Sequence, residues 1–205
     1  MGIYSRWILP RVLEFAMSQK AVMRERPATL AGARGEVLEI GFGTGLNLEF
    51  YPNTVERLTV LDPAEMLAGR VERRIAAAPV PVNVERCSAE SLPFDAGRFD
   101  CVVTTWTLCS IPDAHAALAE IRRVLRPGGR YLFIEHGRSS DPRIARRQDR
   151  LDWWHGLATG GCHVNRPIDE LIARGGMEIE TLDRFEMPGT PRYLAAHYRG
   201  VASVA

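Results

Sequence analysis

The chain has 205 residues, of which 46% are apolar and 25% charged, the composition of one ordinary globular domain. Its 26 Lys and Arg residues nearly balance its 25 Asp and Glu residues, so a net charge of +1 gives no electrostatic case for nucleic acid as a partner. The four cysteines form no C-x-x-C pair, and their spacing matches neither a zinc site nor a disulfide scaffold. We therefore expect reduced thiols, no metal site and a cytoplasmic protein.

The most apolar early segment, 7–17, is interrupted by Pro10, Arg11 and Glu14. It is too short and too charged to span a bilayer, and it lacks the cleavage pattern of a signal peptide. The segment is instead typical of an amphipathic helix, and we expect residues 1–34 to form a helical cap.

Short β-branched runs then alternate with longer helical ones. Strands are predicted at 36–40, 57–61, 82–86, 99–105 and 130–136, and helices at 64–78 and 113–125. Asp113 is the expected N-cap of the second helix, which the sequence Pro-Gly-Gly at 127–129 should end. Strands separated by helices imply crossover connections, and hence a mostly parallel sheet with helices on both faces.

The pattern changes after residue 136. Helices are predicted at about 141–157 and at 168–174, and an arginine-rich stretch in the first is interpreted as a solvated helix face. Two more alternating strands, 177–185 and 192–200, are joined by 187-MPGTP-191, which indicates an antiparallel hairpin at the sheet edge. The sequence predicts a single α/β domain over residues 1–205, with seven strands.

The glycine-rich segment 38-LEIGFGTGL-46 follows the first predicted strand. A Rossmann dinucleotide fingerprint needs glycine where Leu46 stands, and a Walker A loop needs a lysine that is missing here. What remains is G-x-G-x-G, whose missing side chains let the backbone approach a ligand. Asp62 ends the second strand about 20 residues later, where a carboxylate can accept both hydroxyls of a ribose. The sequence therefore predicts a nucleoside-containing ligand.

Four segments together carry a family resemblance. Residues 39–45 (EIGFGTG), 61–63 (LDP), 88–94 (SAESLPF) and 125–133 (LRPGGRYLF) resemble, in order and spacing, the motifs of class I S-adenosylmethionine-dependent methyltransferases. The resemblance implies a Rossmann-like fold, S-adenosyl-L-methionine as the methyl donor and S-adenosyl-L-homocysteine as its product. It divides the chain into a cap (1–34), a cofactor-binding half (35–136) and a substrate-side region (137–205). A non-catalytic cofactor-binding module remains an alternative.

The resemblance also implies roles for individual residues. The glycines would pass beneath the methionyl and ribose parts of the donor, and Asp62 would hold the ribose diol. Ser88 replaces an aspartate that often meets the adenine amino group, so the backbone of Ala89 would take over. Tyr4 would be a lid residue near the methionyl carboxylate, or else a packed aromatic. The expected cofactor-binding residues are Tyr4, Glu39, Gly41, Gly43, Gly45, Asp62, Pro63, Met66, Ser88, Ala89, Glu90, Thr105 and Trp106.

Three further segments narrow the resemblance. Residues 104–113 (TTWTLCSIPD), 134–138 (IEHGR) and 160–166 (GGCHVNR) resemble the alkyl-thiol methyltransferase group and its bacterial relatives. The animal members carry an N-terminal membrane anchor that is not recognised here, so a membrane surface is not the expected location. The implied acceptor is a small lipophilic molecule, with a thiol first and an amine or phenol next. A phospholipid or quinone acceptor at a membrane surface is the alternative.

A thiol acceptor reacts as its thiolate, which nearby polar groups must help to form. The catalytic candidates are His136, Asp152 and His155, although a lone histidine of this kind is more often structural. Cys162 is expected to be a small buried hydrophobic residue, because direct methyl transfer needs no covalent enzyme intermediate.

Overall fold

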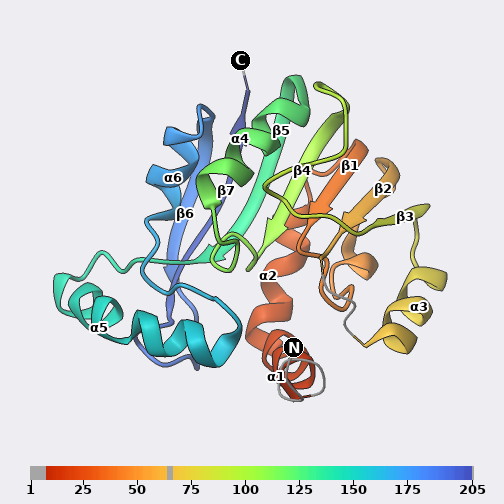
Figure 1. Ribbon diagram of the computed structural model, residues 1–205. Helices are drawn as coiled ribbons and strands as arrows, with labels where there is room; N and C mark the ends of the chain where they lie inside the picture. Colours follow the sequence, from red (N-terminus) through yellow and green to blue (C-terminus); the bar gives the residue numbers. More distant parts are fainter. Residues whose placement is uncertain (1–7, 64–66, 205) are drawn as a thin grey trace.

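The computed structural model describes residues 8–63 and 67–204, so the expectations for Tyr4 and Met66 lie outside the described residues. Seven strands form one sheet in the order β3-β2-β1-β4-β5-β7-β6 (Figure 1). Neighbouring strands from β3 to β5 in this order pair in parallel, and β7 pairs antiparallel with both β5 and β6. The predicted α/β fold with an antiparallel edge hairpin is confirmed. The strands are β1 (Gly35–Ile40), β2 (Val55–Leu61), β3 (Val82–Glu85), β4 (Phe99–Thr105), β5 (Leu125–His136), β6 (Glu178–Glu186) and β7 (Ala196–Ser203).

Helices cover both faces of the sheet. Residues of α4 (Ala114–Val124) and α6 (Ile168–Arg174) pack with one face of β4 and β5 in the larger core cluster. Residues of α2 (Lys20–Leu30), α3 (Ala68–Ala76) and the short 3-10 helix η2 (Leu48–Phe50) belong to the cluster on the other face. Near-continuous apolar runs such as that of β4 are therefore buried on both sides.

Two helices lie at the carboxyl ends of the parallel strands. Figure 1 shows α1 (Leu9–Met17) and α5 (Pro142–Thr159) at this end of the molecule. They meet there, because a Cβ atom at Gly160, just after α5, would lie 2.9 Å from Leu9 Cδ2. Ligands bind at this end of open α/β sheets.

Two predicted boundaries were wrong. Strand β5 begins at Leu125 rather than at 130, because Leu125 already pairs with Phe99 and a bulge then absorbs the glycines before Arg130 pairs with Cys101. Strand β7 begins at Ala196 rather than at 192, because Met187 N–H donates to Ala195 O and the intervening residues form the turn.

Candidate functional site

The glycine loop after β1 has a backbone that other residues rarely adopt. Gly41, Gly43 and Gly45 have φ values of +78°, +57° and +78°. A Cβ atom at Gly41 would also lie 2.1 Å from Thr107 Oγ1, in the loop after β4. The backbone N–H of Gly43 donates to Asp62 Oδ2 over 2.8 Å, so the loop is tied to the end of β2. The structure thus brings these predicted residues together in one place.

Glu39 lies beneath this loop with only 1% of its surface exposed. Its two carboxylate oxygens accept hydrogen bonds from Asn47 Nδ2 and from the Tyr51 hydroxyl, each over 2.8 Å. Burial raises the pKa of Glu39 to about 7, against the opposing effect of those hydrogen bonds and of the Arg26 charge. These contacts are all with the protein, so they favour a role for Glu39 in supporting the loop.

Arg26 of α2 joins the same buried network, although no pattern in the sequence sets it apart from the other arginines. Its Nη1 donates to Asn47 Oδ1 over 2.6 Å, and Asn47 Nδ2 in turn lies 3.0 Å from Thr105 Oγ1. Burial lowers the pKa of Arg26 to about 10, so the guanidinium is charged at neutral pH. Its Nε is buried and has no hydrogen-bond partner within the described part of the chain. A buried cation with a spare donor suits an anionic ligand group.

Trp106 leaves β4 in a left-handed conformation, with φ of +52°, which is rare for a bulky residue and typical of functional sites. Its indole lies 5.0 Å from the Arg26 guanidinium and 6.2 Å from the His197 ring. His197 in turn stacks on Phe185 and lies 6.3 Å from the His136 ring. We call Trp106, His197 and Phe185 the aromatic wall. Burial lowers the pKa of His197 to about 4, so His197 is uncharged at neutral pH. His197 was missed because the alternating pattern of its strand, β7, carried no hint of a site.

The segment predicted to meet the adenine is held by its own polar groups. Ser88 Oγ donates to Glu90 Oε2 over 2.7 Å, and Glu90 Oε1 accepts from the backbone N–H of Asp113. The Ala89 side chain is buried between them. Pro63, beside Asp62, is exposed. Because Ser88 is engaged by Glu90, the expectation that the Ala89 backbone serves the adenine stays a prediction.

The three catalytic candidates have different surroundings. His136 Nε2 lies 3.0 Å from Cys162 Sγ, and Cys162 Sγ lies 3.6 Å from Cys109 Sγ. Asp152 instead uses its two oxygens for His163 Nδ1 and for the backbone N–H of Val164, which favours an anchoring role in the loop after α5. The ring of the third candidate, His155, lies 6.0 Å from that of Tyr193, edge to face.

Cys162 is half-buried, so the expectation of a buried hydrophobic residue was wrong. Contact with Cys109 and burial raise the pKa of the Cys162 thiol to about 11, against hydrogen bonds with His136 and His155. The loop that carries it is clamped to the loop after β4, because His163 N–H donates to Cys109 O over 2.9 Å. Arg166 donates to the carbonyls of Leu108 and Pro112 in the same loop. The clamp fixes the two thiols next to each other.

Glu14 explains why a charge interrupts the apolar run of α1. The side chain is buried, and its carboxylate accepts from Thr44 Oγ1 of the glycine loop and from Arg74 Nη2 of α3, the latter over 2.8 Å. Burial opposes ionisation, but the Arg74 and Thr44 hydrogen bonds outweigh it and hold the pKa of Glu14 below its ordinary value. Helix α1 is therefore fastened to the glycine loop.

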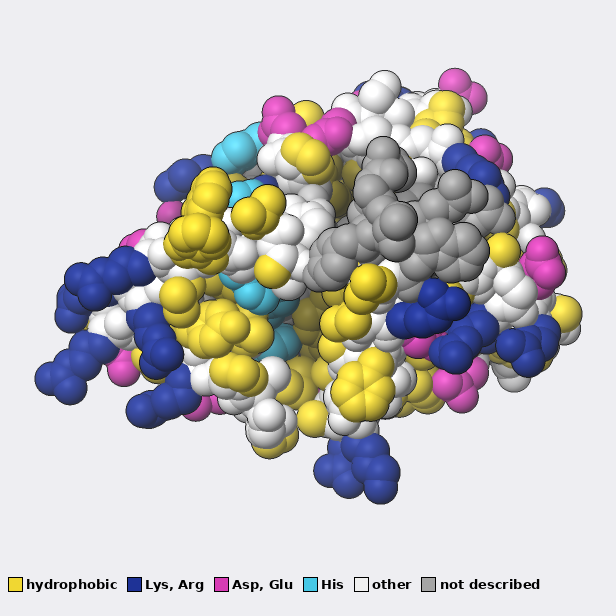
Figure 2. All heavy atoms as spheres, turned by 60° about the horizontal axis from the view of Figure 1, so that its bottom comes forward, with side chains coloured by type: hydrophobic (Ala, Val, Ile, Leu, Met, Phe, Trp, Pro, Cys, Tyr) yellow, Lys and Arg dark blue, Asp and Glu magenta, His cyan; other side chains and the backbone are white. Residues whose placement is uncertain are grey.

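Exposed apolar side chains surround the opening at this end of the molecule. Figure 2 shows hydrophobic side chains on both sides of a hollow in which histidine side chains are visible. Those from α1 and α5 with about half or more of their surface exposed are Ile8, Val12, Phe15, Trp153, Trp154 and Leu157. Helices α1 and α5 thus present apolar surface around the entrance.

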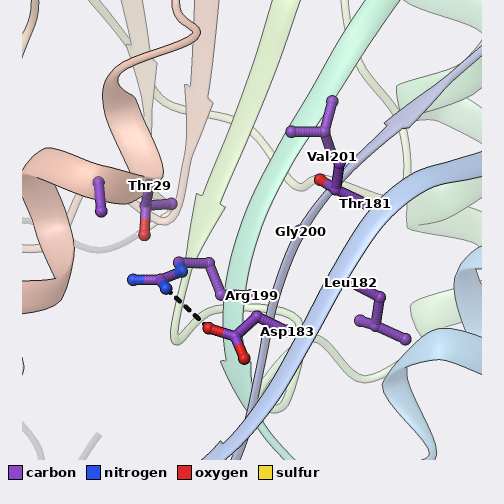
Figure 3. A pocket seen from close by; sticks show the side chains of 8 residues that line it. Thr29, Thr181, Leu182, Asp183, Arg199, Gly200 and Val201 are labelled. Atoms are coloured by element: carbon purple, nitrogen blue, oxygen red, sulfur yellow. Dashed lines mark hydrogen bonds and ion pairs between the residues drawn. The ribbon is translucent and has the colours of Figure 1, made fainter.

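A separate pocket of about 240 Å³ lies between α2 and the strands β6 and β7 (Figure 3). An ion pair between Arg199 and Asp183, 2.7 Å long, crosses its floor. None of the residues that line this pocket belongs to the glycine loop or to the end of β2. We therefore assign the candidate site to the hollow at the carboxyl ends of the strands.

Comparison with known proteins agrees with this geometry. Residues 38–133 match a family model described as a methyltransferase domain. Human thiol S-methyltransferase TMT1A is 31% identical over 193 residues, which cover 90% of this chain and 78% of the human protein. Phosphatidylethanolamine N-methyltransferase of Cereibacter sphaeroides is 31% identical over 186 residues, 86% of each chain. The fold is also that of a solved structure, Burkholderia thailandensis 1,6-didemethyltoxoflavin-N1-methyltransferase with bound S-adenosylhomocysteine. The two structures match with a TM-score of 0.67 at 19% sequence identity, and the match covers 100% of this chain and 91% of that one.

Proposed function

Because the chain belongs to the class I S-adenosylmethionine-dependent methyltransferases, we propose that it transfers the donor's methyl group to the sulfur of a small lipophilic thiol. One observation carries the choice of acceptor. Beside the glycine loop stands a wall of Trp106, His197 and Phe185, and on the side of His197 the wall is followed by the imidazole of His136 and the thiols of Cys162 and Cys109. Such a wall favours an apolar acceptor with a soft nucleophile over a charged one.

The residues present fit the donor. The left-handed glycines give the loop a backbone without side chains, and Asp62 beside them would accept the ribose hydroxyls. We assign the spare Nε–H of the buried Arg26 to the methionyl carboxylate. The segment 88–90 and Pro63 would border the adenine, and Trp106 the sulfonium.

The donor supplies an electrophilic methyl group on a sulfonium. The chain supplies position, because holding the acceptor sulfur in line with that methyl group is worth about 7–11 kcal/mol. The aromatic wall excludes water from the reacting atoms, and the fixed conformation of Trp106 sets its shape. The acceptor must also lose its proton, since a free thiol has a pKa of about 8.5.

Steady-state kinetics with a series of alkanethiols tests the proposal. We expect kcat/KM to rise with alkyl chain length, and alkanols and alkylamines of equal length to react at least a hundred times more slowly. A His197→Leu variant should keep the preference for longer chains, because it leaves the wall apolar. Alkylamines that react as fast as alkanethiols would contradict the assignment of sulfur as the acceptor atom.

A phospholipid or quinone acceptor at a membrane surface is the second candidate. The exposed apolar side chains of α1 and α5 favour it, together with exposed arginines along α5 at 143, 146, 147 and 150, which suit anionic lipid. Among the described residues, no helix is long and apolar enough to cross a membrane. Flotation with anionic vesicles tests this candidate: binding that is lost in Trp153→Ser/Trp154→Ser supports it, and protein that stays at the bottom of the gradient removes it.

A further inference from the structure

Three side chains of metal-ligand type meet at the acceptor side of the site. Cys109 lies in the loop after β4, His136 at the end of β5 and Cys162 in the loop after α5. Their ligand atoms all lie within 4.8 Å of one another. Sequence spacing predicted no metal site, because 26 or more residues separate each neighbouring pair along the chain. The fold, rather than a local motif, brings them together.

The separations resemble those between ligands of one tetrahedral ion. Sulfur ligands about 2.3 Å from zinc lie about 3.8 Å apart, and a sulfur and a nitrogen ligand about 3.6 Å apart. The two Sγ atoms of Cys109 and Cys162 are 3.6 Å apart, and His136 Nε2 is 3.0 Å from Cys162 Sγ. The sulfurs of a disulfide would lie about 2.05 Å apart. A shift of about half an ångström by the imidazole would bring its separation from Cys162 Sγ to the tetrahedral value.

The cluster is also held in place, and one of its ring nitrogens lacks a hydrogen-bond partner among the described residues. The hydrogen bond from His163 N–H to Cys109 O joins the two loops that carry the thiols. His136 Nδ1 is buried, and no described residue hydrogen-bonds to it. An imidazole that acts as a general base is usually oriented by a third group on its other nitrogen. A ligating imidazole is usually oriented in the same way, so the ligand role proposed for His136 rests on the two thiols that lie on the side of its Nε2.

We propose that Cys109, His136 and Cys162 bind one zinc ion, or a similar thiophilic divalent ion, and leave a fourth position for the sulfur of the acceptor thiol. This inference rests on the proposed function, since it names how the thiol is bound and activated. Three protein ligands with one exchangeable position are typical of catalytic rather than structural zinc. Thiolate and imidazole are the ligands that zinc prefers.

The acceptor sulfur forms a bond to the ion as its S–H proton passes to solvent. The metal-bound thiolate sulfur then attacks the donor methyl, so that a new S–CH₃ bond forms while the bond from that methyl to the sulfonium breaks. The electron pair of the broken bond stays on S-adenosyl-L-homocysteine. The neutral thioether product is a weaker ligand than a thiolate and leaves the ion.

Binding of Co²⁺, a spectroscopic substitute for zinc, tests the site without reference to activity. Reduced full-length protein is titrated with Co²⁺ under anaerobic conditions, and zinc is then added as a competitor. We expect one equivalent, with the intense visible bands of tetrahedral cobalt and a thiolate charge-transfer band. Cys109→Ser and Cys162→Ser should each weaken binding at least tenfold. Cys87→Ser is the matched control, because Cys87 is also a half-buried free thiol but lies outside the cluster.

The fourth position is tested by adding an alkanethiol to the cobalt protein. We expect its bands to shift with the thiol and not with an alkanol of equal length. Wild-type protein that binds Co²⁺ and zinc no more tightly than the Cys109→Ser/Cys162→Ser variant would overturn the proposal. So would thiol methylation at an undiminished rate in protein shown to be metal-free, and that result would leave the proposed function standing. Cobalt binding without methylation of any thiol would sink the proposed function and keep the metal site.

Discussion

The carboxylate of Asp62 is the best-defined contact of the donor side, and its replacement gives a graded prediction. Asp62 Oδ2 accepts the Gly43 N–H over 2.8 Å, and the proposed ribose contacts use the same carboxylate. Asp62→Asn keeps an oxygen for Gly43 but loses the charge, whereas Asp62→Ala loses both. We therefore expect donor affinity to fall in the order wild type, Asn, Ala.

The magnitudes follow from the contacts. Hydrogen bonds to charged groups contribute about 1.5–3 kcal/mol and neutral ones about 0.5–1.5 kcal/mol, so Asp62→Asn should cost about 1–1.5 kcal/mol, roughly a tenfold weaker Kd. Asp62→Ala removes the ribose acceptor altogether, and it also leaves the Gly43 N–H without its acceptor, which should lower the free energy of unfolding of the ligand-free protein by about 1–3 kcal/mol.

Calorimetric titration with S-adenosyl-L-homocysteine measures both affinities, and urea unfolding without ligand measures the stability. Asp183→Asn is a suitable control, because Asp183 is a carboxylate in β6 that pairs with Arg199 away from the glycine loop. Equal Kd values for wild type, Asp62→Asn and Asp62→Ala would refute the assignment of Asp62 to the ribose.

Three further predictions concern the loop and the network beneath it. Gly41→Ala should lower the free energy of unfolding by at least about 1–3 kcal/mol, because Gly41 has a φ of +78° and a Cβ atom there would collide with Thr107. Gly97 has a φ of +67° but nothing within 4 Å of such a Cβ atom, so Gly97→Ala should lower it less, as measured by urea unfolding. Folding raises the pKa of Glu39 from 4.5 to about 7, so wild-type stability should fall as pH rises through that window, by about 3 kcal/mol relative to Glu39→Gln; parallel pH profiles would disprove this. Arg26→Gln should weaken binding of S-adenosyl-L-homocysteine about tenfold but not that of methylthioadenosine, which lacks the carboxylate, and equal losses for both would contradict its role.

The sheet and the glycine loop could be predicted because local signals specify them. Apolar runs such as that of β4 report burial on both faces, and the positive φ of Gly43 needs a residue without a side chain. The residue types at 41, 43, 45 and 62 therefore indicated the donor side before any contact was known.

The acceptor side could not be predicted in the same way, because it is assembled from distant segments. His197 faces His136 only through the antiparallel pairing of β5 and β7, and Cys109 meets Cys162 across 53 residues. Arg26 gains its importance from burial beside Asn47, which no local pattern specifies. Asp152 was predicted as catalytic from its place after the sheet, but its contacts are those of an anchor.

A competition assay tests most directly whether the protein transfers the methyl group to the sulfur of a thiol. Purified protein is incubated with S-adenosyl-L-methionine carrying a trideuterated methyl group and an equimolar mixture of an alkanethiol, an alkylamine, a phenol and anionic phospholipid vesicles. Product masses then show which acceptor carries the label. We expect the labelled methyl thioether as the main product; label on the phospholipid or the amine, with the thiol unmodified, would contradict the proposed function.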